Sequence, residues 1–225
     1  MFFDPYYLLA IAPALLLAFW ANIRVKSAYA AARQQPAPLS GAAAARHILD
    51  SAGLGGVAIE AVGGMLTDHY DPRGKVLRLS QEVYSSYSLA AVGIAAHESG
   101  HALQDAGAYA PLVVRNAIVP VAGFGSNASF ILLIAGLLVH SLSLVWIGIA
   151  LFSAVVFFQL VNLPVEFDAS ARAKAQLAGL GIVSPQQMVY VDRVLSAAAW
   201  TYVAATLQAV MTLLYLITRF GNNRR

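Results

Sequence analysis

Two histidines one helical turn apart, with a glutamate between them, are the residues of this chain best suited to metal chemistry. His97, Glu98 and His101 stand in the sequence His-Glu-Ser-Gly-His. Positions i and i+4 lie on one face of an α-helix, so both imidazoles can point at one ion. Glu98 follows the first histidine, where its carboxylate can reach a water molecule at that ion. In the H-E-x-x-H motif the histidines bind Zn²⁺ and the glutamate is the general base.

The residues around this motif predict one apolar helix that carries it. An alanine-rich run follows Ser88 and continues through Asp105, with Gly107 near its end. The alternative interpretation is a structural helix whose two histidines belong to the core. A glutamate on such an apolar helix needs a polar partner, and this favours the metal site.

Composition indicates a membrane protein. Of the 225 residues, 59% are hydrophobic and only 11% are charged, whereas soluble domains carry about 25% charged residues. The net charge of +3 therefore predicts no nucleic-acid partner, and the basic residues are better interpreted as topology signals. The chain has no cysteine, so a metal site must use histidine and carboxylate ligands.

Four apolar runs have roughly the length that crosses a lipid bilayer, so we expect about four transmembrane helices. The first is an uncleaved N-terminal anchor, because basic residues follow it rather than precede it. The short His140-Ser141 connection predicts a helical hairpin between the second and third runs. The last run is the most polar of the four. The runs are Tyr6–Ile23, Ile118–Val139, Leu142–Leu163 and Ser196–Thr218.

Basic residues predict how these helices are oriented. Eight Lys and Arg fall between Arg24 and Arg115, and none stands at the His140-Ser141 turn. The positive-inside rule then places the motif helix in the cytoplasm and this turn outside, in the cell (inner/plasma) membrane. Three arginines at the C-terminus, Arg219, Arg224 and Arg225, disagree with this rule, because they would lie outside if the last run crosses the membrane fully.

A small α+β unit should precede the motif helix. Ser40 is a candidate N-cap for a helix over 41–52, and short strands are expected at Val57–Val62, Leu66–Tyr70 and Lys75–Leu79. The last of these strands could pair with an extended substrate at a sheet edge, or it could merely close the sheet.

The expected fold class is therefore a mainly α-helical integral membrane protein with a small cytoplasmic α+β zinc-peptidase unit. The expected division of the chain is an anchor (1–26), the cytoplasmic unit with the zinc helix (27–115), a transmembrane hairpin (116–163), a third-ligand helix and connection (164–195), and a C-terminal membrane helix and tail (196–225).

Tetrahedral zinc with one open position needs a third protein ligand. Glu166 is favoured, because the hairpin returns the chain to the side it left and a glutamate beside a span is a functional candidate. His140 is excluded by the expected topology, and His47 and His69 stand in polar, solvent-facing contexts. The candidates considered are His47, His69, Asp105, His140, Glu166 and Asp168.

Two stretches, 96–104 around the motif and 163–170 around Glu166, resemble the YugP-like membrane zinc metallopeptidases, and the resemblance covers nearly the whole chain. The order of these elements along the chain is more distantly similar to that of HtpX-like and prenyl-protein membrane proteases. The resemblance implies that His97 and His101 are ligands, that Glu98 is the base and that Glu166 is the third ligand. In the distant relatives an Asp four residues after the Glu ligand orients a ligand histidine. This chain departs from that pattern, with Ser170 there and Asp168 two residues after Glu166.

The expected function is a membrane-embedded zinc endopeptidase with one Zn²⁺ per chain and its active site at the cytoplasmic membrane face. Glu98 would take the proton of the attacking water and return it to the leaving amine. Arg172 and His69 are candidate donors to the oxyanion. The expected partners are the lipid bilayer and polypeptide substrates, including membrane or misfolded proteins. The alternatives are a metal-binding scaffold or transporter without catalysis, and a zinc hydrolase that acts on lipid or lipidated substrates.

Overall fold

The computed structural model describes residues 4–65 and 67–221. The first three residues of the expected anchor, Leu66 of the expected second strand, and Arg224 and Arg225 of the tail lie outside the described residues. The chain forms two compact units. One comprises Met1–Trp20, Ala110–Pro164 and Trp200–Arg225, and the other comprises Ala21–Tyr109 and Val165–Ala199.

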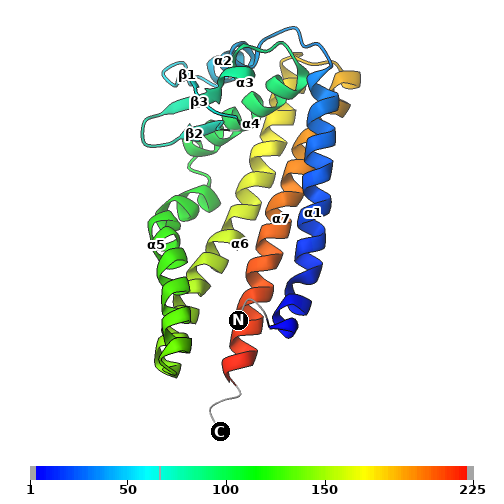
Figure 1. Cartoon of the computed structure of the whole chain (residues 1–225). Coiled ribbons are helices and arrows are strands. Elements are labelled where there is room, and N and C mark those ends of the chain that lie inside the picture. The colour runs from blue at the N-terminus through cyan, green and yellow to red at the C-terminus, as the bar shows by residue number, and fades with distance from the viewer. Residues whose placement is uncertain (1–3, 66, 222–225) are drawn as a thin grey trace. The chain divides into compact units, whose positions relative to one another are not determined.

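Four helices are long and apolar enough to cross a membrane, and they match the four expected spans. They are α1 (Pro5–Arg33), α5 (Ala110–Leu138), α6 (Leu142–Gly179) and α7 (Pro185–Gly221) (Figure 1). Large apolar side chains such as Leu9, Phe124 and Leu138 are more than 70% exposed. Exposed apolar surface of this kind is costly in water and is the normal surface of a helix in lipid.

The first unit contains a hairpin of α5 and α6. A Cβ on Gly136 would lie 2.8 Å from the backbone nitrogen of Val145, and a Cβ on Gly148 would lie 3.1 Å from that of Leu133. These glycines let the two helices approach closely, as small residues do in membrane helix pairs. His140, in the connecting turn, has a φ of 54°. The hairpin expected from the short connection is confirmed.

Aromatic and polar contacts join α1 to α7 in the same unit. The rings of Trp20 and Trp200 meet edge to face with centroids 5.7 Å apart, and those of Tyr7 and Tyr215 lie 5.1 Å apart. The Tyr215 hydroxyl donates a hydrogen bond to the Asp4 carboxylate. Tyr215, a polar residue of the last run, therefore joins α7 to the start of the chain, whereas the hydroxyl of Thr206 donates to carbonyl oxygens of α6 and α7.

Helix α6 continues through Pro164, where the sequence predicts that a span ends and a separate helix begins. Proline removes one backbone hydrogen bond but does not stop this helix. The residues before Pro164 belong to the first unit and those from Val165 belong to the second. Glu166 therefore stands on the direct continuation of the apolar run.

The second unit contains a three-stranded sheet with the order β1 (Ala58–Val62), β3 (Val76–Ser80), β2 (His69–Asp71). Strand β3 pairs in parallel with β1 and antiparallel with β2. Because β3 is the central strand, it has no free edge for a substrate. The interpretation that this strand merely completes the sheet is correct, and the edge strands of the sheet are β1 and β2.

Helix α4 (Leu89–Ala106) is the centre of this unit, together with α2 (Gly41–Ser51) and α3 (Gln81–Ser85). Ser40 and Ser88 are N-caps, each accepting a hydrogen bond 3.3 Å long from the backbone N–H three residues later. Twelve residues of α4 are buried. Two apolar clusters meet on it. One contains Leu49, Leu77 and Leu79, and the other contains residues from the C-terminal end of α6 and the beginning of α7. The alanine-rich sequence of α4 allows this crowding on several sides.

Candidate metal site

The structure brings His97 and His101 of α4 together with Glu166 of α6. The Glu166 Oε2 atom lies 3.2 Å from His97 Nε2 and 3.7 Å from His101 Nε2. One donor atom from each residue lies within 4.8 Å of the others, so the three residues could hold one metal ion. In the described part of the chain this is the only such group of histidine and carboxylate residues.

Gly100 makes this meeting possible. A Cβ at position 100 would lie 2.5 Å from the carbonyl oxygen of Ala169, much closer than two such atoms can approach. The backbone of α4 therefore touches the backbone of α6 at this point. Glu166 lies three residues before Ala169, on the same face of α6, and so points at the two histidines. The glycine within the motif is a packing requirement of the site.

In each histidine the Nε2 atom faces Glu166, and the other ring nitrogen, Nδ1, has a side-chain partner. His97 Nδ1 lies 3.1 Å from Ser170 Oγ, and His101 Nδ1 lies 2.9 Å from Gln104 Oε1. An amide oxygen can only accept, so His101 carries a proton on Nδ1, and its Nε2 atom faces Glu166. Partners of this kind fix the rotation and tautomer of metal-binding histidines.

Gln104 is itself held from the other side. Its Nε2 atom donates to the carbonyl oxygen of Val165 at 2.7 Å and to Asp168 Oδ2 at 2.8 Å. Asp168 also pairs with Arg172 at 2.6 Å. Asp168 therefore acts on His101 through Gln104 rather than directly. Arg172, a candidate oxyanion donor in the sequence, is engaged by Asp168 and lies 5.6 Å from the ring centre of Tyr109.

Sequence reasoning missed the parts played by Gln104 and Ser170. Gln104 lies three residues after His101, on the same helical face, so its spacing could have shown it. Ser170 occupies the position at which the distant relatives carry Asp, and its hydroxyl lies at hydrogen-bonding distance from His97. The expected site residues were the ionisable ones, whereas these two partners are neutral.

Glu98 follows His97 of the candidate metal-binding group and lies toward the sheet. The backbone N–H of Tyr70, in β2, donates to Glu98 Oε2 at 3.1 Å. The side chain of Tyr70 is tied to the same helix, because its hydroxyl donates to Asp105 Oδ2 at 2.7 Å. Lys75 pairs with the same carboxylate. Asp105, considered as a third ligand, therefore anchors the β2–β3 turn to α4.

The other candidate ligands lie elsewhere. His47 and His69 are exposed, and His69 Nδ1 lies 2.7 Å from the carbonyl oxygen of Thr67. His140 is in the turn between α5 and α6, in the first unit. None of the three belongs to the group that could hold a metal among the described residues.

Electrostatics follow from burial and from these contacts. Burial opposes protonation of His101, but its hydrogen bonds to Glu166 and Gln104 and the charges of Glu98 and Glu166 raise its pKa above the ordinary value. Burial and the hydrogen bond to Asp105 raise the pKa of the Tyr70 hydroxyl, which therefore stays protonated as a donor. The raised pKa of His101 reflects the carboxylates of Glu98 and Glu166 beside it.

The residues present fit a zinc ion. Glu166 is 5% exposed, and its partners in the described structure are the two imidazoles. A buried carboxylate without a fixed cation is unfavourable, and a divalent ion between these three residues would compensate its charge. Two imidazole nitrogens and one carboxylate oxygen are also a donor set of catalytic zinc sites.

Comparisons with known proteins agree with this donor set. Residues 7–221 match the model of a family described as "Putative neutral zinc metallopeptidase". The chain is 47% identical over 213 residues to the "Putative membrane protease YugP" of Bacillus subtilis (strain 168), with 94% of this chain and 95% of that protein covered. No solved structure matches the chain. With nearly its whole length matched by the family model and by this relative, the chain belongs to this zinc metallopeptidase family.

Proposed function

We propose that this chain is a membrane-embedded zinc endopeptidase that holds one Zn²⁺ through His97, His101 and Glu166. The observation that carries the proposal is the close grouping of these three donors beside the carboxylate of Glu98. Membership of a zinc metallopeptidase family supports both the metal and the reaction.

Glu98 is the general base in this proposal. A bound zinc ion would make a water molecule acidic enough to lose a proton near neutral pH and would polarise the substrate carbonyl. Glu98 accepts that proton as the water oxygen attacks the peptide carbon. It then gives the proton to the amine nitrogen as the C–N bond breaks. The N–H of Tyr70 occupies Oε2 of Glu98, which leaves Oε1 for this transfer.

The side chains that contact the two histidines keep the imidazole rings in position in the absence of substrate. Gln104 and Ser170 hold the imidazole rings, so the site does not have to reorganise when substrate binds. Tyr70 and Asp105 hold β2 against the side of α4 that carries Glu98.

We place the active site at the cytoplasmic face of the plasma membrane, in a multi-pass protein. The basic residues before α5 and their absence from the turn before α6 support this orientation. The Bacillus relative is named as a membrane protease, which supports a membrane location. The substrates would be polypeptides that reach this face, including membrane or misfolded proteins.

The test compares the purified full-length chain with Glu98→Gln, using an unfolded soluble protein and a fluorescent phospholipid as alternative substrates. We expect zinc-dependent cleavage of the polypeptide only, reduced about 10²- to 10⁴-fold in Glu98→Gln with the zinc content unchanged. Glu60→Gln, in β1 on the surface of the same unit, is the control. Equal cleavage by Glu98→Gln, or cleavage of the lipid alone, would contradict the proposal.

A further inference from the structure

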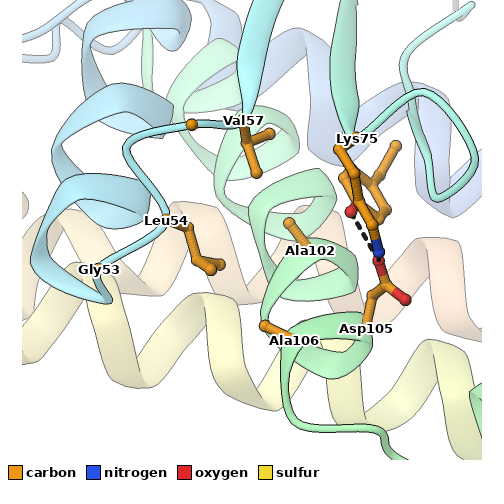
Figure 2. A pocket seen from close by; sticks show the side chains of 9 residues that line it. Gly53, Leu54, Val57, Lys75, Ala102, Asp105 and Ala106 are labelled. Atoms are coloured by element: carbon orange, nitrogen blue, oxygen red, sulfur yellow. Dashed lines mark hydrogen bonds and ion pairs between the residues drawn. The ribbon is translucent and has the colours of Figure 1, made fainter.

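A cavity of about 360 Å³ lies beside α4 in the second unit, next to the stretch that carries Glu98. Ala102 and Ala106 of α4 line it, with Leu54 and Val57 on one side and Lys75 and Asp105 on the other (Figure 2). Tyr70, Gly53 and Gly56 complete the lining. Gly53, Gly56, Lys75 and Ala106 are exposed, so the cavity is open to the outside of the unit.

Helical spacing relates this cavity to the proposed base. Glu98, Ala102 and Asp105 follow one another at i, i+4 and i+7, so they share one face of α4. His97 and His101 lie on the neighbouring face, toward Glu166. Ala102 is one turn from Glu98, about 6 Å along the helix axis. The cavity therefore begins one turn beyond the carboxylate that takes the proton.

Tyr70 connects the two places directly. Its backbone N–H donates a hydrogen bond to Glu98, and the same residue is part of the cavity lining. An extended peptide rises about 3.3 Å per residue. If the cleaved bond of a substrate lies at Glu98, one of the side chains within about four residues of that bond would therefore reach this cavity.

The chemistry of the lining selects the type of side chain. Leu54, Val57, Ala102 and Ala106 form apolar walls. The charges of Lys75 and Asp105 neutralise each other, and the Tyr70 hydroxyl is already committed to Asp105. A charged side chain entering here would lose water without gaining a free partner of opposite charge. An apolar side chain would lose only its contact with water, which favours its binding.

We propose that this cavity is the pocket that selects substrates of the zinc endopeptidase, and that it takes one large apolar side chain, such as that of leucine, methionine or phenylalanine. This inference rests on the proposed function, and it adds the substrate class. The pocket side chains do not take part in proton transfer. Their effect is on which peptide bonds are cleaved.

Two neighbouring glycines provide a matched pair of variants. Gly56 lines the cavity, and an added Cβ there meets no atom within 4 Å. Gly55 does not line it, and a Cβ there would make only an ordinary contact, 3.5 Å from Asp50 Oδ1. Neither glycine is among those with positive φ. Gly56→Phe should fill the pocket, and Gly55→Phe should not. Ala106→Phe reaches the same space from α4 and serves if Gly56→Phe does not fold.

The experiment digests one unfolded protein with each full-length variant and maps the cleaved bonds by mass spectrometry. We expect the wild type to favour a large apolar residue at one fixed position relative to the cleaved bond. Gly56→Phe and Ala106→Phe should lower kcat/KM for these bonds about 10- to 100-fold, a range typical of changes in an apolar specificity pocket. Bonds with alanine or glycine at that position should be cleaved at the wild-type rate, and Gly55→Phe should keep the wild-type profile.

An unselective wild type, or an unchanged profile in both pocket variants, would overturn the pocket while leaving the hydrolysis intact. Failure of the proposed function gives a different result, because the loss of cleavage in Glu98→Gln is measured separately. A uniform fall in the cleavage of all bonds by both pocket variants would also overturn the proposal, since it would indicate a structural role alone.

Discussion

The backbone of α4 at Gly100 touches the backbone of α6 at Ala169, where a single added methyl group would lie 2.5 Å from a carbonyl oxygen. This contact sets the separation of the two helices that carry the candidate ligands. It also explains why a residue without a side chain stands between Glu98 and His101.

Gly100→Ala should therefore damage the metal site without removing any ligand. The two helices must separate, so His97 and His101 move away from Glu166. We expect zinc affinity to fall at least tenfold and the protein to lose about 1–3 kcal/mol of stability, as is typical of overpacked sites. Zinc titration and thermal unfolding measure both effects. Gly179→Ala, on α6 with no atom within 4 Å of the added Cβ, should change neither.

Gln104→Ala should weaken zinc binding through His101. The imidazole would lose the acceptor that holds its Nδ1 proton, and Asp168 would lose its link to the site. Loss of such a partner commonly costs 10- to 100-fold in metal affinity or activity. A competition titration with a zinc chelator measures the affinity, with the exposed Gln186 as the control substitution. Unchanged affinity in Gln104→Ala would show that Gln104 only joins α4 to α6.

Ser170 offers a test in both directions. Ser170→Ala removes the partner of His97 and should reduce zinc affinity and cleavage, by about 10-fold. Ser170→Asp places a carboxylate where the distant relatives carry one and should keep zinc affinity at or above the wild-type value. The same chelator competition measures both variants. If Ser170→Ala binds zinc as tightly as the wild type, the hydroxyl does not orient His97.

The proposed orientation can be tested with single cysteines, because the natural chain has none. Arg73→Cys, Ser141→Cys and Gln186→Cys place thiols in the β2–β3 turn, the α5–α6 turn and the start of α7. A membrane-impermeant thiol reagent on intact cells should label only the cysteine at position 141. Labelling at positions 73 and 186, with none at 141, would move the proposed active site to the outside.

The pattern of apolar runs was enough to predict four long helices, and turn residues were enough to predict the small sheet. The prediction ended a span at Pro164 because proline usually interrupts a helix. The structure continues α6 through it, since apolar contacts at Val165, Ala169 and Ala173, all fully buried, outweigh one missing hydrogen bond. Such contacts come from packing with distant segments, which local sequence does not contain.

The grouping of His97, His101 and Glu166 was predictable because i and i+4 spacing and the hairpin together limit where these residues can meet. Strand order was not predictable, so Lys75–Leu79 was considered as a substrate-binding edge although β3 lies at the centre of the sheet. Gln104 was overlooked for a similar reason. A neutral amide shows its role only when its partners on α6, Val165 and Asp168, are seen beside it.

The zinc content of the purified full-length protein and of Glu166→Ala, each dialysed against the same buffered zinc concentration, tests the central claim most directly. We predict one zinc ion per chain in the wild type and in a Glu60→Ala control. Glu166→Ala should retain less than about a tenth of that amount, because two histidines alone leave the site one ligand short. One zinc ion per chain in Glu166→Ala, bound with unchanged affinity, would contradict the account.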